Sequence, residues 1–212
     1  MEFSRSDSLP LTRPMTADAE SAALTRLRQG DLAALDLLVL RYQVEATRAA
    51  YLITRDRAAA EDAAQTVFVR LPDRIHQYDP RRPFAPYLFR SVINEALKSA
   101  QRRERSVSLH AERAADGQTL EDLLPDWDSD PADAFDQGEL RRVVWEAMGK
   151  LPPKQRAVAA MRFYLEWSEA EIAQSLAIPV GTVKWRLHAA RARLQTLLAP
   201  FMNAALAAWL GV

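Results

Sequence analysis

The sequence predicts an all-α protein with two small helical domains joined by a flexible acidic linker. Apolar residues recur at spacings of three and four over most of the chain, and the alternation typical of strands is not found. Residues 106–138 interrupt this pattern with Pro, Gly and acidic residues. The charge divides the chain at the same place. Residues 20–105 hold 15 Lys and Arg residues and 11 Asp and Glu residues. Residues 106–138 hold one basic and 9 acidic residues, whereas residues 139–199 hold 10 basic and 5 acidic residues.

The chain is expected to fall into five segments. In order, they are a disordered N-terminal tail (1–18), the first helical domain (19–105), the acidic linker (106–138), the second helical domain (139–199) and an apolar C-terminal extension (200–212). The extension has apolar residues at helical spacing, so we expect it to pack on the second domain or to dock a partner. The two basic domains are suited to a polyanion, whereas the acidic linker is also consistent with a solvated loop.

The composition argues against several function classes. The chain has 212 residues and no Cys, so disulfides and thiolate metal sites are excluded, and its three His residues are scattered. No long uncharged apolar run or cleavable leader pattern is found, so we expect a cytoplasmic protein without membrane insertion. A phosphate-binding Gly loop, a metal cluster and a nucleophile constellation are also lacking. We therefore expect no catalytic residues, no metal and no cofactor, and a protein that is not an enzyme.

The first domain is expected to be helical almost throughout. Asp31 is placed to cap a helix, and a later helix is expected from residue 58 to 71, where Pro72 stops or kinks it. Residues 76–86 contain too many Pro residues for a regular helix. A final helix is expected over residues 87–105, and it ends in a run of cations.

The second domain contains the most informative stretch, residues 168–193, which predicts two helices joined by a tight turn. Ser168 is a good N-cap, and Pro179 separates the two helices. The second helix has a buried stripe made of Val183, Leu187, Ala190, Leu194 and Leu197. Its other side shows donors and cations, namely Thr182, Lys184, Trp185, Arg186, His188 and Arg191. This arrangement suits the DNA major groove, although a merely solvated basic face is the alternative.

Three stretches together resemble the sigma-70 family of bacterial RNA polymerase initiation factors, specifically the extracytoplasmic-function (ECF) group. Residues 60–70 resemble the core-binding helix of region 2, and residues 78–94 resemble its promoter-melting loop and helix. Residues 151–156, with the helix from Gly181, resemble region 4. The resemblance implies that residues 19–105 form region 2 and residues 139–199 form region 4. It implies binding to core polymerase through the β′ clamp helices and the β flap, and to promoter DNA.

The resemblance also implies roles for individual residues. Contacts to core polymerase are expected from Glu61, Asp62, Gln65, Thr66 and Phe68. Contacts to the melted −10 element are expected from Tyr78, Phe84, Tyr87, Arg90, Asn94, Lys98, Arg102 and Arg103, with Arg105 as a further phosphate contact. Contacts to the −35 element are expected from Thr182, Lys184, Trp185, Arg186, His188 and Arg191. For Phe84 and Tyr87, packing in the core is the alternative.

The sequence departs from the family pattern at several positions. Trp185 stands where a small polar residue is usual, which suggests an unusual −35 preference. Pro72 suggests that the core-binding helix ends early, and Ala177, in place of the usual Gly, suggests a less left-handed turn. Thr66 stands where an acidic residue is common, so we consider the hypothesis that its phosphorylation restores the charge.

The sequence leaves three candidate functions for the protein. The first is an initiation factor that acts with core polymerase, in a group commonly held inactive by an anti-sigma factor. The second is a stand-alone helix-turn-helix regulator, and it leaves the region 2 resemblance unexplained. The third is a sigma mimic that only sequesters an anti-sigma protein, and it would not need the cations near residues 98–105 and 184–191. The first function is the one that we predict.

Overall fold

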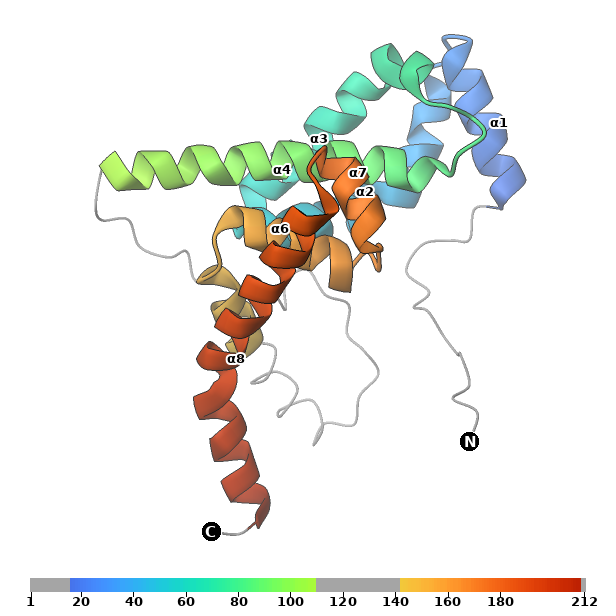
Figure 1. Ribbon diagram of the computed structural model, residues 1–212. Coiled ribbons are helices and arrows are strands. Elements are labelled where there is room, and N and C mark those ends of the chain that lie inside the picture. Colours follow the sequence, from blue (N-terminus) through green and yellow to red (C-terminus); the bar gives the residue numbers. More distant parts are fainter. Residues whose placement is uncertain (1–15, 110–141, 211–212) are drawn as a thin grey trace, which may run out of the picture.

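The computed structural model describes residues 16–109 and 142–210, and the fold of these residues is entirely helical (Figure 1). They contain no strand, which confirms the predicted all-α class. Most of the expected disordered tail and of the expected flexible linker lies outside the described residues.

The first domain is a bundle of four α-helices with one short 3₁₀ turn. Its elements are α1 (Ala17–Arg28), α2 (Ala33–Thr54), α3 (Arg57–Arg74), η1 (Ile75–Gln77) and α4 (Phe84–Leu109). Side-chain oxygens cap the starts of α1 and α3. The Thr16 hydroxyl accepts from the Ala19 N–H at 3.3 Å, and the Asp56 carboxylate accepts from the Ala59 N–H at 2.7 Å. Asp31 acts one residue before the N-cap position of α2, where it accepts from the Ala33 N–H at 3.1 Å.

Two helix boundaries expected next to Pro residues in this domain were wrong. Helix α3 does not end at Pro72 but contains it and runs on to Arg74, because the flanking Leu71 and Ile75 are buried and hold the backbone in place. Helix α4 begins at Phe84, three residues earlier than expected. Pro86 then lies in the first turn, where a missing N–H breaks no intrahelical hydrogen bond.

The second domain has a helical segment over residues 142–149, followed by α6 (Pro153–Phe163), α7 (Glu169–Leu176) and α8 (Val180–Leu210). Ser168 and Glu171 form a reciprocal capping box at the start of α7. The expectation of a less left-handed turn was wrong, since Ala177 has φ 52° and ψ 47°. Two backbone hydrogen bonds at the end of α7 hold this turn, from Ala177 to Gln174 and from Ile178 to Ala173.

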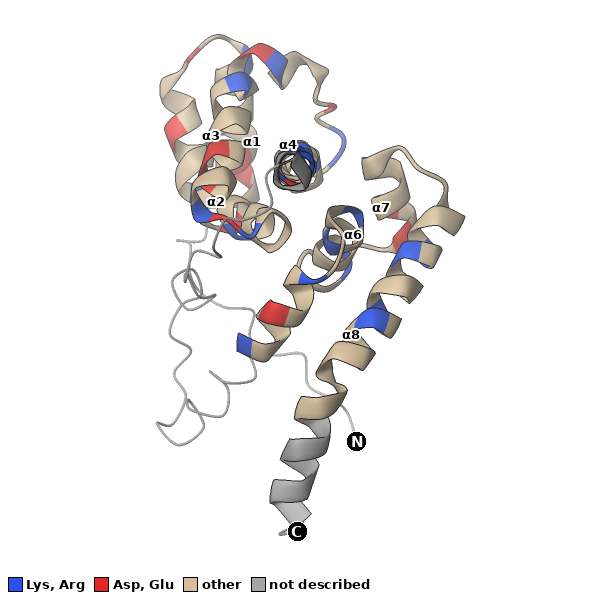
Figure 2. Ribbon diagram, turned by 90° about the vertical axis from the view of Figure 1, so that its left-hand side faces the viewer, with Lys and Arg blue, Asp and Glu red and all other residues tan. Residues whose placement is uncertain are grey.

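The two domains pack against each other. Helix α6 lies against α2 and α4, and α7 lies beside α4, so buried residues of both domains form one continuous apolar core. Figure 2 shows α4 nearly end-on, with α1 to α3 on one side and α6 to α8 on the other. The sequence pattern had indicated two domains but no contact between them.

Candidate functional site

The outward face of α3 brings most of the predicted core-binding residues together. Glu61, Asp62 and Gln65 are exposed on adjacent turns, and the Glu61 carboxylate pairs with the Arg57 guanidinium at 2.9 Å. Val69, four residues after Gln65, is 67% exposed and adds an apolar group to this face. The sequence analysis missed Val69, although its spacing from Asp62 and Gln65 could have indicated it. We call Glu61, Asp62, Gln65 and Val69 the α3 face.

Two of the predicted core-binding residues lie elsewhere. Phe68 is buried in the core of the first domain, so its side chain supports α3 from behind and is not available to a partner here. Thr66 is half-buried. Neither the structure nor the comparisons below support its phosphorylation, and the hypothesis is not carried further.

The start of α3 is anchored by a polar cluster at Asp56. Its carboxylate caps the helix and also pairs with the Arg103 guanidinium of α4. Burial raises the pKa of Asp56, but the hydrogen bonds from Ala59 and Arg103 outweigh burial, so the pKa lies below its usual value. The cation of Arg103, which the sequence assigned to DNA, is therefore engaged in holding α4 to α3.

The aromatic residues of the Pro-rich loop form one cluster. The Tyr78 and Phe84 rings meet edge to face at 5.4 Å, and Tyr87 lies 5.3 Å from Tyr78. Phe84 is only 1% exposed and Tyr78 is buried, so these two rings form the interior of the loop. Tyr87 is half-buried and its hydroxyl donates to the Arg74 carbonyl at 2.9 Å. Tyr87 is therefore the one ring of the three with a substantial open surface.

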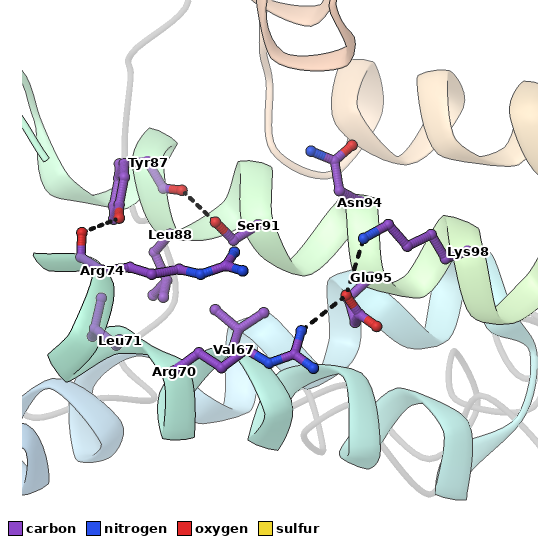
Figure 3. Close-up of a pocket in the computed structure, with 10 residues that line it drawn as sticks. All are labelled: Val67, Arg70, Leu71, Arg74, Tyr87, Leu88, Ser91, Asn94, Glu95 and Lys98. Carbon is purple, nitrogen blue, oxygen red and sulfur yellow. Dashed lines mark hydrogen bonds and ion pairs between the residues drawn. The ribbon is translucent and has the colours of Figure 1, made fainter. Parts of the chain in front are cut away.

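A small groove of about 140 Å³ lies between α3 and α4, beside Tyr87 (Figure 3). Arg70 and Arg74 of α3 and Ser91 and Lys98 of α4 line it. Glu95 of α4 links the two helices, because its carboxylate lies 3.8 Å from Arg70 of α3, and it also lies 3.5 Å from Lys98 on its own helix. The groove thus offers an aromatic ring, hydroxyl groups and cations within one concave surface. Figure 3 shows that Asn94 points away from Arg70 and Val67, toward the second domain.

The remaining predicted promoter cations project from α4. Arg90, Lys98, Arg102 and Arg105 are exposed, which suits contact with phosphates. Sequence reasoning missed Arg70 and Arg74, which add two cations to the same groove from α3. Their separation of four residues could have indicated this, because it places both guanidinium groups on one side of the helix.

The first half of α8 presents the predicted −35 residues. Lys184, Trp185, His188 and Arg191 are exposed, whereas Thr182 and Arg186 are half-buried. Trp185 is 64% exposed, an unusual exposure for so large an apolar ring. The Lys184 ammonium lies 4.0 Å from Glu169 of α7, and the Arg191 guanidinium lies over the Phe163 ring at 5.6 Å. Figure 2 shows the cations of α8 gathered in this first half.

Two kinds of feature are absent from the described part of the chain, residues 16–109 and 142–210. No helix there is long and apolar enough to cross a membrane. Among the same residues, no group of three or more His, Asp and Glu side chains is arranged to hold a metal ion.

Comparisons with known proteins agree with this geometry. Residues 38–106 match the family "Sigma-70 region 2" and residues 141–194 match "Sigma-70, region 4". The chain is 31% identical over 176 residues to the ECF RNA polymerase sigma factor SigW of Bacillus subtilis, which covers 82% of this chain and 94% of SigW. It is 30% identical over 188 residues to the ECF RNA polymerase sigma-E factor of Haemophilus influenzae, with 86% and 97% covered.

Two solved structures share the fold. One is CnrH in complex with the cytosolic domain of CnrY, with a TM-score of 0.57 and 23% identity over 86% of this chain and 99% of CnrH. The other is the sigma factor RpoE of Bartonella quintana in complex with the anti-sigma factor NepR, with a TM-score of 0.58 and 19% identity over 82% and 98%. With both sigma regions matched in order and a relative at 31% identity over nearly its whole length, the chain belongs to the ECF group of the sigma-70 family of RNA polymerase sigma factors.

Proposed function

We propose a division of work among the residues of this sigma factor. The α3 face binds core polymerase, the groove between α3 and α4 holds the melted −10 strand, and the first half of α8 reads the −35 element. Acidic groups beside an exposed Val suit a partner surface with basic and apolar groups. The observation that carries the −10 assignment is the groove itself, where the Tyr87 ring and the cations of Arg70, Arg74 and Lys98 lie together.

The chemistry of this groove suits an unstacked base. A base that leaves the duplex gains about 1–3 kcal/mol by stacking on an aromatic side chain. Tyr87 offers such a ring, and the neighbouring cations suit the phosphates on either side. We assign Tyr78 and Phe84 to the support of Tyr87, because both are buried beneath the loop surface. Such a mechanism works by binding alone, so we propose that the protein is not itself an enzyme.

The proposed −35 contacts divide by exposure. Lys184, Trp185 and His188 project from the first turns of α8 and are placed to meet base edges in the major groove. Arg191, farther along α8, is better placed for phosphates, and half-buried Thr182 and Arg186 hold the helix. The Trp185 ring offers apolar contact to a thymine methyl group, so we expect a −35 preference in which thymine is prominent.

An anti-sigma factor is a further proposed partner. The two solved relatives were captured with the cytosolic domain of CnrY and with the anti-sigma factor NepR. Because this chain shares their fold, a protein that covers the α3 face or the surfaces of the second domain is consistent with its architecture. We propose the cytoplasm as the place of action, since core polymerase and promoter DNA are found there.

The test is run-off transcription with core polymerase and a promoter fragment. We expect transcripts only when the protein and core polymerase are both present, and we expect the protein to co-elute with core polymerase. A protein that binds promoter DNA alone and never co-elutes with core would instead be a stand-alone regulator. A protein that neither binds core nor supports transcription, but captures an anti-sigma factor, would be a mimic.

A further inference from the structure

The segment that leaves α3 and enters the Pro-rich loop presents backbone carbonyls at a helix end. Helix α3 ends at Arg74, the turn η1 covers Ile75–Gln77, and Tyr78 is the residue that follows it. The last carbonyls of a helix have no N–H partner within the helix, so they depend on turns, side chains or water, and they favour a nearby cation. The carbonyls of residues 74, 75 and 78 are therefore available to side chains from other elements.

Arg28, in the last turn of α1, binds two of these carbonyls. Its Nε and Nη2 atoms both donate to the Ile75 carbonyl at 3.3 Å, and Nη2 also donates to the Tyr78 carbonyl. The same guanidinium lies 5.9 Å from the centre of the Tyr78 ring, within the range of a cation–π contact. Arg28 thus holds both the backbone and the ring of Tyr78.

Tyr78 in turn contacts the ring that we assign to the melted strand. The centres of the Tyr78 and Tyr87 rings are 5.3 Å apart, and the Tyr87 hydroxyl donates to the Arg74 carbonyl at 2.9 Å. The hydroxyl of Tyr87 is therefore held by residue 74, and its ring adjoins that of residue 78. Both contacts belong to the segment that Arg28 holds, so the position of the Tyr87 ring depends on where this segment lies.

Helix α1 is a firm support for Arg28. Leu24 and Leu27 of α1 are buried in the core of the first domain, and α1 packs against α2. The Glu20 carboxylate accepts a hydrogen bond from the Tyr42 hydroxyl of α2. The Tyr42 ring meets the Phe84 ring edge to face at 5.6 Å. Arg28 is therefore carried by a helix that is fixed to the core by apolar and polar contacts.

The loop itself is only loosely packed beside α1. A pocket of about 220 Å³ lies between them, with Ser21 and Thr25 of α1 and Pro80 and Pro83 of the loop in its lining. These two Pro residues are exposed, so little buried surface fixes this part of the loop. Arg28 also lines the pocket, and its hydrogen bonds join the two elements there. Without these bonds the loop would be free to shift relative to α1.

From these contacts, and resting on the function proposed above for the groove, we propose that Arg28 is a positioning residue for capture of the melted −10 strand. It holds residues 74–78 where Tyr87 can present its ring to an unpaired base, and it does not itself bind DNA. The match to Sigma-70 region 2 covers residues 38–106, so α1 and Arg28 precede it. Capture of the strand thus depends on a helix outside the matched region.

Three substitutions in the full chain isolate this role. Arg28→Met keeps the apolar stem but removes the donors, whereas Arg28→Lys keeps the charge without the planar fork that reaches two carbonyls. Arg26→Met is the matched control, because Arg26 lies in the same turn of α1, is exposed, and pairs with Asp31 at 2.7 Å. Each variant is assembled with core polymerase. The affinity of this holoenzyme is measured for a promoter fragment mismatched over the −10 region and for a duplex that carries only the −35 element.

We expect Arg28→Met to weaken binding to the mismatched fragment about tenfold and Arg28→Lys about threefold, in line with partial loss of one stacked base. Binding to the −35 duplex and co-elution with core polymerase should stay unchanged, and Arg26→Met should behave as the wild type. The decisive measurement repeats Arg28→Met in a Tyr87→Ala background, where a residue that acts through Tyr87 has no further effect. The dependence of the logarithm of the affinity on that of the salt concentration should keep its wild-type slope, since loss of a phosphate contact would reduce the slope by about one.

Independent, additive effects of Arg28→Met and Tyr87→Ala would overturn the proposal. A reduced salt slope would do the same, because Arg28 would then bind DNA directly. Equal losses in Arg26→Met, or loss of core binding and of −35 binding in both Arg28 variants, would assign Arg28 to general stability and also overturn it. Failure of the groove function is read separately, from Tyr87→Ala alone: if that variant binds the mismatched fragment normally, the function proposed for the groove is wrong.

Discussion

Arg156 offers a prediction whose size follows from the structure. Its guanidinium donates to three backbone carbonyls, those of Ile53 at 2.9 Å, Gly149 at 3.1 Å and Leu151 at 3.0 Å. Burial lowers the pKa of Arg156 from its usual value, although an Arg remains charged at any accessible pH. Arg156→Met keeps the apolar stem of the side chain but removes all three donors.

The expected cost is the balance of two terms. Each carbonyl left without a partner costs about 1–3 kcal/mol, whereas removal of the buried cation recovers part of its desolvation cost. We therefore expect Arg156→Met to lower the free energy of unfolding by about 2–4 kcal/mol. With a urea m-value of about 2–3 kcal/mol per M, the midpoint of unfolding should fall by about 1 M. Fluorescence of the five Trp residues follows the transition.

Arg162→Met is the matched control on the same helix. Arg162 is half-buried and donates one long hydrogen bond, 3.3 Å, to the Trp167 carbonyl. The same substitution there should lower the free energy of unfolding by less than about 1 kcal/mol. Equal costs at the two positions would refute the reasoning, because the effect would then come from loss of an Arg in α6 and not from the three carbonyls.

Three further predictions concern the surface and the caps. Trp185→Ala should change the free energy of unfolding by no more than about 0.5 kcal/mol, since the ring is largely exposed. The same substitution should weaken binding to a −35 duplex about tenfold. A fluorescence anisotropy titration that gives the wild-type affinity would contradict this prediction. Val69→Asp should weaken co-elution with core polymerase without altering thermal unfolding, because Val69 is exposed on the α3 face. The pKa of Asp56 is lower in the folded protein than its ordinary value of 3.8. Its ionised carboxylate therefore stabilises the fold at any pH above 3.8, and this contribution is lost as the pH falls through the lower pKa of the folded state. The wild type should therefore be more stable than Asp56→Asn near pH 7, and the difference should shrink below about pH 4; a constant difference in urea titrations would exclude the ion pair with Arg103 as its cause.

The sequence predicted the secondary structure well at positions where nearby side chains determine the backbone conformation. The capping box at Ser168 and the restart of the helix after Pro179 were both predictable, because each depends on residues within one turn. Pro72 and Ala177 were not. Pro72 lies inside a helix although it has no N–H to donate, and Ala177 is left-handed although it carries a Cβ, because buried neighbours or hydrogen bonds at a helix end outweigh these local preferences.

The sequence predicted which residues belong to the candidate site more accurately than it predicted which of their side chains are exposed. The spacing of polar residues found most of the α3 face, yet it placed Phe68 there as well, and that ring is in the core. Likewise Phe84 and Tyr87 looked equivalent in sequence, whereas only Tyr87 keeps an open surface beside the groove. Which side of a helix faces solvent depends on its neighbours, and a single sequence holds no direct record of them.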